Sequence, residues 1–226
     1  MKRCVAAFAA AVCCWSAVAQ GLLDFTADEQ ARIARHGPWP PKPAADPANR
    51  VERQPAAIAW GRELFFDPGL AADGARACAS CHQAERAFQD GRPVAEGRAA
   101  GRRNTPSLWN AAQWRWFGWD GAHDSLWAAC LARLLAADEM GHDIGSLART
   151  LRARPELPSR WRAAFGTPVP ADDERLAVGI AKVLAAWQAT LVSPRSAFDQ
   201  FRAALLRGDR HAAARYPLAA QRGLKL

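Results

Sequence analysis

A five-residue motif constrains the fold of this 226-residue chain more than any other feature. Two cysteines, separated by two residues and followed by a histidine, form Cys78-Ala79-Ser80-Cys81-His82. This spacing is the attachment signature of c-type haem. The two thiols add to the vinyl groups of haem, a single turn spans them, and the histidine ligates the iron. The chain is therefore expected to fold around one large, flat, covalently bound cofactor.

Two other interpretations of the paired cysteines are weaker. Half of a zinc site would need a second pair of ligands, and the sequence offers none. A thioredoxin-like redox pair would lie at a strand-to-helix turn, but no segment shows sustained strand alternation. The motif therefore favours haem c bound through Cys78 and Cys81, with His82 on the iron.

The ligand opposite His82 decides what such a haem does. A sulfur or nitrogen there makes an electron carrier, and an open position lets peroxide bind and makes an enzyme. Met140 follows His82 by 58 residues, a separation typical of the methionine in small electron-transfer cytochromes. His123 and His142 are further candidates, although each is interpreted first as a surface or second-shell residue. Spacing alone leaves these alternatives open.

The N-terminus has the features of an export signal. Lys2 and Arg3 precede an apolar stretch at residues 4–15, and Ala17-Val18-Ala19 forms a small-x-small cleavage site. The apolar stretch is too short to span a bilayer, and no later one approaches the roughly 20 residues that a spanning helix needs. We expect a signal peptide at residues 1–19, a periplasmic mature chain from Gln20, and no membrane span after its removal.

Signal removal changes the cysteine count and the charge. Three of the six cysteines precede Gln20, so haem attachment leaves Cys130 as the odd thiol, and its apolar neighbours predict an inert, buried side chain. The formal net charge of +8 becomes +6 without Lys2 and Arg3. The excess is spread along the chain without a dense basic block, which argues against nucleic-acid binding. A basic face for an acidic redox partner and an ordinary basic surface both remain open.

Apolar spacing predicts a mostly α fold. Seven prolines and glycines at residues 37–55 predict an extended segment. Residues 84–107 are expected to form a long ordered loop. Helices are expected at residues 56–66, at 125–135, from a cap at Ser146 through Arg154, after a cap at Asp172 or Asp173, and near the end at 219–226.

Several longer motifs, in one order across the mature chain, resemble the bacterial di-haem cytochrome c peroxidase and MauG family. They are GRELFFDPGLAADGARACASCH (61–82), FQDGRP (88–93), RRNTPSLWNA (102–111), WFGWDGAHDSLW (116–127), DEMGHD (138–143) and KVLAAWQATLVS (182–193). Members have two cytochrome c-like domains, each with its own haem; the first haem is peroxidatic and the second supplies electrons. The resemblance implies an all-α, cytochrome c-like haem domain with long loops at residues 56–217, after a Pro-rich segment at 20–55. It implies that 218–226 begin a second, truncated domain.

The resemblance also assigns roles to individual residues. His82 matches the proximal ligand of the peroxidatic haem, and Glu139 matches the distal glutamate that shuttles a proton during peroxide cleavage. Trp119 matches the tryptophan between the two haems, suited to relaying an electron. Asn104 matches a ligand of the calcium ion at the domain interface.

Two positions depart from the family pattern. The loop at residues 94–103 lacks the histidine that caps the peroxidatic haem in many members, and Glu96 stands at the matching position. This predicts an open haem at rest. Ala129 stands in place of the usual distal glutamine, which raises the importance of Glu139.

The resemblance therefore implies a periplasmic c-type haem peroxidase or peroxide-dependent oxidase that acts on hydrogen peroxide. Its electrons would come from a small redox protein (a cytochrome c or a cupredoxin) or from an oxidisable protein substrate. A full-length protein would hold a second haem. A mono-haem electron-transfer cytochrome with Met140 as sixth ligand, and an inactive fragment, are the alternatives.

Overall fold

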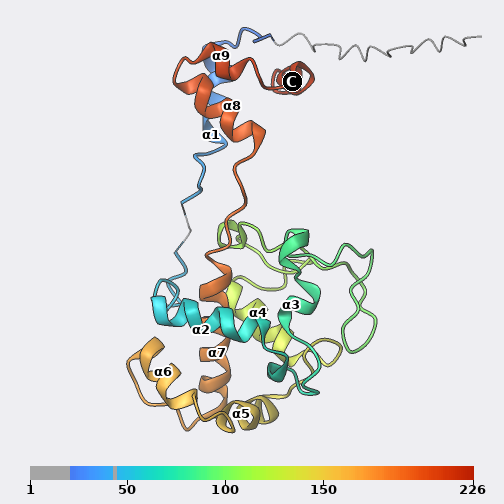
Figure 1. The fold of residues 1–226 in the computed structure, drawn as a ribbon, viewed down its shortest axis with the longest axis vertical. Coiled ribbons are helices and arrows are strands. Elements are labelled where there is room, and N and C mark those ends of the chain that lie inside the picture. Colours follow the sequence, from blue (N-terminus) through green and yellow to red (C-terminus); the bar gives the residue numbers. More distant parts are fainter. Residues whose placement is uncertain (1–20, 43–44) are drawn as a thin grey trace, which may run out of the picture. The chain divides into compact units, whose positions relative to one another are not determined.

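The computed structural model describes residues 21–42 and 45–226, so the expected signal peptide lies outside the described residues. Their regular structure is entirely helical, with only isolated β-bridges elsewhere, which confirms the all-α fold (Figure 1). The elements are α1 (Ala27–Arg35), α2 (Pro55–Phe66), η1 (Pro68–Leu70), α3 (Cys78–Cys81), η2 (Ala84–Arg86), η3 (Ala111–Gln113), α4 (Leu126–Leu135), α5 (Ile144–Arg152), α6 (Leu157–Phe165), α7 (Asp173–Gln188), α8 (Ala197–Leu206), α9 (Arg210–Ala213) and α10 (Leu218–Gly223).

The chain forms two compact units, which are described separately. In the described residues, the central unit lies within residues 40–194, and the terminal unit combines residues 21–39 with residues 195–226. The described part of the terminal unit starts at residue 21. None of the helices in the described ranges is long and apolar enough to cross a membrane.

The crossing of α2 and α7 organises the central unit (Figure 1). The Asp172 carboxylate accepts a hydrogen bond from the Arg175 backbone N–H at 2.7 Å, so Asp172 provides the predicted cap of α7. Gly61 of α2 lies against α7 so closely that a Cβ atom there would be 2.1 Å from the Val183 backbone oxygen. The absence of a side chain at Gly61 therefore allows the two helices to touch.

The beginning of α5 differs from the prediction. The Asp143 carboxylate accepts a hydrogen bond from the Ser146 N–H at 2.7 Å, and the Ser146 hydroxyl accepts one from the Asp143 N–H at 3.0 Å. This reciprocal arrangement is a capping box, in which Asp143 rather than Ser146 is the cap residue. The prediction that Ser146 caps the helix was wrong because the Asp143 carboxylate accepts the Ser146 N–H, so the helix already begins at Ile144. α6 was not expected from the sequence.

The terminal unit has an apolar core of its own. Its buried residues come from both ends of the chain and are Phe25, Ile33, Phe201, Ala204 and Ala213. The Phe201 ring stacks on Tyr216 with 4.7 Å between centroids and meets Phe25 edge-on at 5.8 Å. The aromatic contacts join α8 to the segment before α1.

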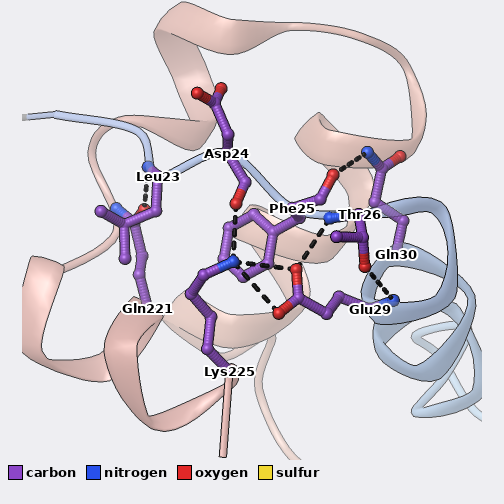
Figure 2. Close-up of polar contacts among 8 residues, drawn as sticks. All are labelled: Leu23, Asp24, Phe25, Thr26, Glu29, Gln30, Gln221 and Lys225. Atoms are coloured by element: carbon purple, nitrogen blue, oxygen red, sulfur yellow. Dashed lines mark hydrogen bonds and ion pairs between the residues drawn. The ribbon is translucent and has the colours of Figure 1, made fainter.

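Gln221 closes the terminal unit from the predicted last helix, α10. Its side chain is fully buried, and its amide oxygen accepts a hydrogen bond from the Leu23 N–H at 2.9 Å (Figure 2). Its amide nitrogen donates to the Gly21 oxygen at 2.9 Å and to the Tyr216 oxygen at 2.7 Å. Three hydrogen bonds therefore compensate the burial of this polar group.

Lys225 makes a second link between the two ends of the chain. Figure 2 shows its ammonium group between the Asp24 backbone oxygen, at 2.7 Å, and the Glu29 carboxylate, at 2.9 and 3.1 Å. The hydrogen bond from Lys225 is the main reason that the pKa of Glu29 lies below its ordinary value. Glu29 also accepts the Thr26 N–H at 2.7 Å in the capping box of α1, so one carboxylate orders both segments.

Candidate haem site

The paired cysteines lie on α3, a single helical turn. The His82 N–H donates to the Cys78 oxygen at 2.9 Å, and the Ala77 N–H donates to the Ser80 hydroxyl at 3.1 Å. Residues three apart on a helix share a face, so the turn brings Cys78 and Cys81 to the same side. Burial raises the pKa of Cys78 to about 12 and raises that of Cys81 as well, so both are neutral thiols at pH 7.

One ring nitrogen of His82 is fixed by the backbone. Nδ1 lies 2.8 Å from the Phe88 carbonyl oxygen, and a carbonyl can only accept, so Nδ1 carries the proton. Nε2 therefore keeps its lone pair for a metal. Burial lowers the pKa of His82, which favours the neutral ring that ligation requires. Ala87 and Phe88 have φ of 57° and 58°, in the left-handed region that residues other than glycine rarely adopt. This backbone conformation sets the position of the Phe88 carbonyl.

Asp90 holds the loop around Phe88. Its carboxylate is 5% exposed and accepts hydrogen bonds from the Thr105 hydroxyl at 2.9 Å and the Arg92 N–H at 3.0 Å. Arg86 donates to the Asp90 backbone oxygen at 3.1 Å. These hydrogen bonds fix the loop formed by the FQDGRP motif. The fixed loop holds the Phe88 carbonyl that orients His82.

Cys78, Cys81 and His82 all line one cavity of about 510 Å³. Its volume falls within the range of about 300–1,000 Å³ typical of cofactor pockets. Much of its wall is apolar, including Phe65, Leu108, Phe117, Leu126, Leu134 and Leu184. Two thiols one turn apart, an oriented imidazole and an apolar wall fit a covalently bound haem.

The loop at residues 94–103 forms another wall with its small residues Ala95, Gly97, Ala99 and Gly101. Glu96 is not among the lining residues and forms an ion pair with Arg92. The Arg98 N–H donates to the Asp138 oxygen at 2.7 Å, and a Cβ atom at Gly97 would lie 2.1 Å from that oxygen. The loop therefore packs closely against the backbone just before Glu139.

Glu139 lines the same cavity and is paired with Arg133, a lining residue that the sequence analysis missed. One guanidinium nitrogen of Arg133 donates to the Glu139 carboxylate at 2.6 Å. Burial raises the pKa of Glu139, while the charge and hydrogen bond of Arg133 oppose that rise. The pair is six residues apart, which no helical spacing indicates, so the sequence contains no local signal for it.

The three candidates for a sixth ligand differ in their surroundings. Met140 lines the cavity and is 6% exposed, and His123 also lines it. His142 is buried, with Nε2 3.0 Å from the Leu70 oxygen and Nδ1 3.1 Å from the Ser146 hydroxyl. Both ring nitrogens of His142 are therefore engaged in joining η1 to α5.

Trp119 and Asn104 are neighbours at the protein surface. The Trp119 side chain is 58% exposed and is not among the cavity-lining residues, and its indole N–H donates to the Asn104 backbone oxygen at 2.8 Å. Asn104 itself lines the cavity. Within the described part of the chain, no three His, Cys, Asp or Glu side chains gather as a metal site.

Cys130 and Gln188 complete the buried wall of the cavity. The Gln188 amide donates to the Cys130 sulfur at 3.2 Å, and burial raises the pKa of Cys130 to about 12, as expected for an inert thiol. Ala129, which replaces the family's glutamine, lines the cavity as well. Gln188 was missed because it lies on α7, 58 residues from Cys130 on α4, and only the packing of these helices brings the two side chains together.

The sequence model of the family described as di-haem cytochrome c peroxidase matches residues 55–209. This region contains α2 to α8 and every residue of the site. The chain belongs to the di-haem cytochrome c peroxidase/MauG family. The match confirms the resemblance of the motifs, and the family's haem c is consistent with the donors in the cavity.

Individual relatives match only part of their own length. The methylamine utilization protein MauG of Methylorubrum extorquens is 33% identical over 206 residues, which is 89% of this chain and 55% of the relative. The cytochrome c551 peroxidase of Pseudomonas aeruginosa is 33% identical over 154 residues, 66% of this chain and 42% of the relative. The crystal structure of a MauG-like protein associated with microbial copper homeostasis matches with a TM-score of 0.61 and 29% identity, over 75% of this chain and 48% of that one. The chain thus spans about half the length of the relatives that it matches.

Proposed function

We propose that this chain is a periplasmic c-type haem peroxidase or peroxide-dependent oxidase. Cys78 and Cys81 would hold one haem through thioether bonds, and Nε2 of His82 would ligate its iron. When bound, the haem supplies the redox chemistry that reduces hydrogen peroxide. The observation that carries the proposal is the cavity that Glu139 shares with the two thiols and the oriented imidazole.

Glu139 is the residue that moves the proton. Peroxide cleavage needs a proton taken from one oxygen and returned to the other, so that water leaves rather than hydroxide. A carboxylate beside the substrate accepts and returns that proton, with a contribution of about 10²–10⁴-fold to the rate. The Arg133 partner fixes the direction of the carboxylate, and the raised pKa brings it closer to the range useful for proton transfer.

Electrons would arrive from outside the described residues. We assign the relay to Trp119, because its exposed indole is anchored to the backbone of a cavity-lining residue, Asn104. The donor is a second haem domain, a small cytochrome c or cupredoxin, or an oxidisable protein substrate. Asn104 is the candidate ligand of a calcium ion that would require further ligands from such a second domain.

The test uses the protein exported from a host that matures c-type cytochromes. Haem should stay attached on a denaturing gel, and C78A/C81A should lose it. Ferric protein should react with hydrogen peroxide and turn over with a reduced small cytochrome. We expect Glu139→Gln to slow the peroxide reaction by about 10²–10⁴-fold. The matched control Glu63→Gln removes a carboxylate that pairs with Arg160, 2.8 Å away and outside the cavity, and should leave the rate within about twofold. A haem-loaded protein inert to peroxide, or E139Q as fast as wild type, contradicts the proposal.

A mono-haem electron carrier is the second candidate, because buried Met140 lines the same cavity. In that case Met140→Leu would change the haem spin state and lower the reduction potential, since a sulfur ligand raises it. An unchanged spectrum in M140L would exclude the electron carrier and leave the peroxidase.

A further inference from the structure

Arg133 lies in the last turn of α4, where the chain turns back on itself. The Glu139 N–H donates to the Ala136 oxygen at 3.0 Å, and the Gly141 N–H donates to the same oxygen at 2.8 Å. The Met140 N–H reaches the Arg133 oxygen at 3.4 Å. This turn returns Glu139 to the side of Arg133, and both side chains line the cavity of the proposed haem.

The loop at residues 94–103 fixes the backbone of this turn from the other side. Arg98 and Ala99 donate their N–H groups to the Asp138 oxygen at 2.7 and 3.3 Å. A Cβ atom at Gly141 would lie 2.7 Å from the Arg98 guanidinium, and Gly141 has φ of +77°. Packing therefore holds the backbone that carries the Arg133–Glu139 pair, and the two side chains are 55% and 38% exposed.

The cavity has an excess of positive charge. Four arginines, Arg76, Arg102, Arg103 and Arg133, line it, against two acidic residues, Asp138 and Glu139. Arg76 is paired with Asp73 at 2.8 Å and Arg103 with Asp120 at 3.3 Å, both outside the lining. The Arg133 guanidinium has five N–H donors and gives one to Glu139, so it has capacity for another acceptor. Hydrogen bonds from a guanidinium to an anion are among the stronger ones in proteins.

We propose that Arg133 makes this cavity a binding site for a small inorganic anion, the class that includes fluoride and the hydroperoxide ion, and that it positions Glu139 beside that anion. Because the cavity is the one assigned to haem, the site rests on the proposed function. When the Glu139 carboxylate takes a proton from hydrogen peroxide, the products are a neutral carboxylic acid and a hydroperoxide ion. The negative charge moves from Glu139 to the peroxide, and Arg133 faces one negative charge before and after the step.

Fluoride is the probe, because it cannot be reduced and its binding is visible in the absorption spectrum of ferric haem. Its dissociation constant is measured at fixed pH and ionic strength for wild type, R133L and R133Q at matched haem content. Loss of a charged hydrogen bond should weaken fluoride by about tenfold or more in both variants. The control R160L breaks a similar exposed arginine–carboxylate pair, Arg160 with Glu63, and should change affinity by less than about twofold.

Imidazole, a neutral haem ligand, separates loss of charge from general damage. Its affinity should remain within about threefold of wild type in the Arg133 variants. Fluoride affinity unchanged in R133L or R133Q, no fluoride binding by wild type, or equal losses for fluoride and imidazole would each overturn the role of Arg133. If R133L does not take up haem, R133Q decides by the same criteria. The proposed function is tested separately, by whether wild-type protein reduces peroxide. If it does, but fluoride binding does not depend on Arg133, only the anion site is refuted.

Discussion

Replacing Gly61 with alanine adds a methyl group where α2 crosses α7. Its carbon would lie 2.1 Å from the Val183 backbone oxygen and 3.0 Å from Cβ of Trp187. Ordinary van der Waals contact begins at about 3.4 Å, so the two helices would have to separate by roughly 1 Å. The obstructing oxygen belongs to the backbone of a buried helix and cannot rotate away.

The expected cost follows from two opposing effects. Overpacking a core destabilises by about 1–3 kcal/mol, whereas glycine to alanine inside a helix stabilises by up to ~1 kcal/mol. A backbone obstruction places Gly61→Ala at the upper end of the first range, so we expect a net loss of about 2 kcal/mol in the free energy of unfolding. For a chain of this size the corresponding fall in Tm is roughly 4–8 °C. The haem absorption spectrum should shift too, because α2 and α7 carry Phe65 and Leu184 to the cavity.

Urea unfolding of the haem-loaded protein, followed by tryptophan fluorescence and haem absorption, measures this loss. Gly145→Ala is the matched control, because Gly145 is also helical but its nearest neighbours, side-chain atoms of Arg149 at 3.4 Å and Asp143 at 3.5 Å, are at ordinary contact distance. We expect G145A to be as stable as wild type or up to ~1 kcal/mol more stable. If G61A unfolds at the same urea concentration as wild type, α2 and α7 do not cross at Gly61 as described.

Three further results are expected. Gln221→Ala should cost about 1–3 kcal/mol and accelerate proteolysis of residues 21–39, because it leaves partly buried backbone groups without partners. The matched change of an exposed glutamine, Gln200→Ala, should do neither. The Ser146 N–H holds the pKa of Asp143 below 3.8, so its charge stabilises the folded state above that pH and the effect is lost as pH falls through the lowered pKa. The stability difference between wild type and Asp143→Asn should therefore shrink on acidification, and an equal difference at neutral pH and at about pH 3 would contradict this. In haem-loaded protein that starts at Gln20, Cys130 should resist Ellman's reagent until denaturant is added, because burial raises its pKa to about 12; fast reaction of native protein would show that it is accessible.

The sequence predicted those features of the fold that local patterns encode. The apolar spacing of α7 and its cap at Asp172 are visible within about 20 residues, and both are present in the structure. The start of α5 was misplaced because Asp143 and Ser146 both suit a cap, and only the backbone geometry decides between them. The residues named for haem attachment are together in one cavity, since the CxxCH spacing alone brings both cysteines to one side of a turn.

By itself, then, the sequence determined the family, the helical class and the haem-attachment motif, because each depends on residues a few positions apart. Tertiary structure alone decided that Arg133 meets Glu139, that Gln188 reaches Cys130, and that Gln221 binds the backbone near Leu23. These contacts join residues separated by between 6 and 198 positions, and no helical or strand period relates them. The turn after α4 sets the first of these contacts. The packing of α4 on α7, and of α10 on the segment before α1, sets the other two, because packing that buries apolar surface must also pair the polar groups left inside.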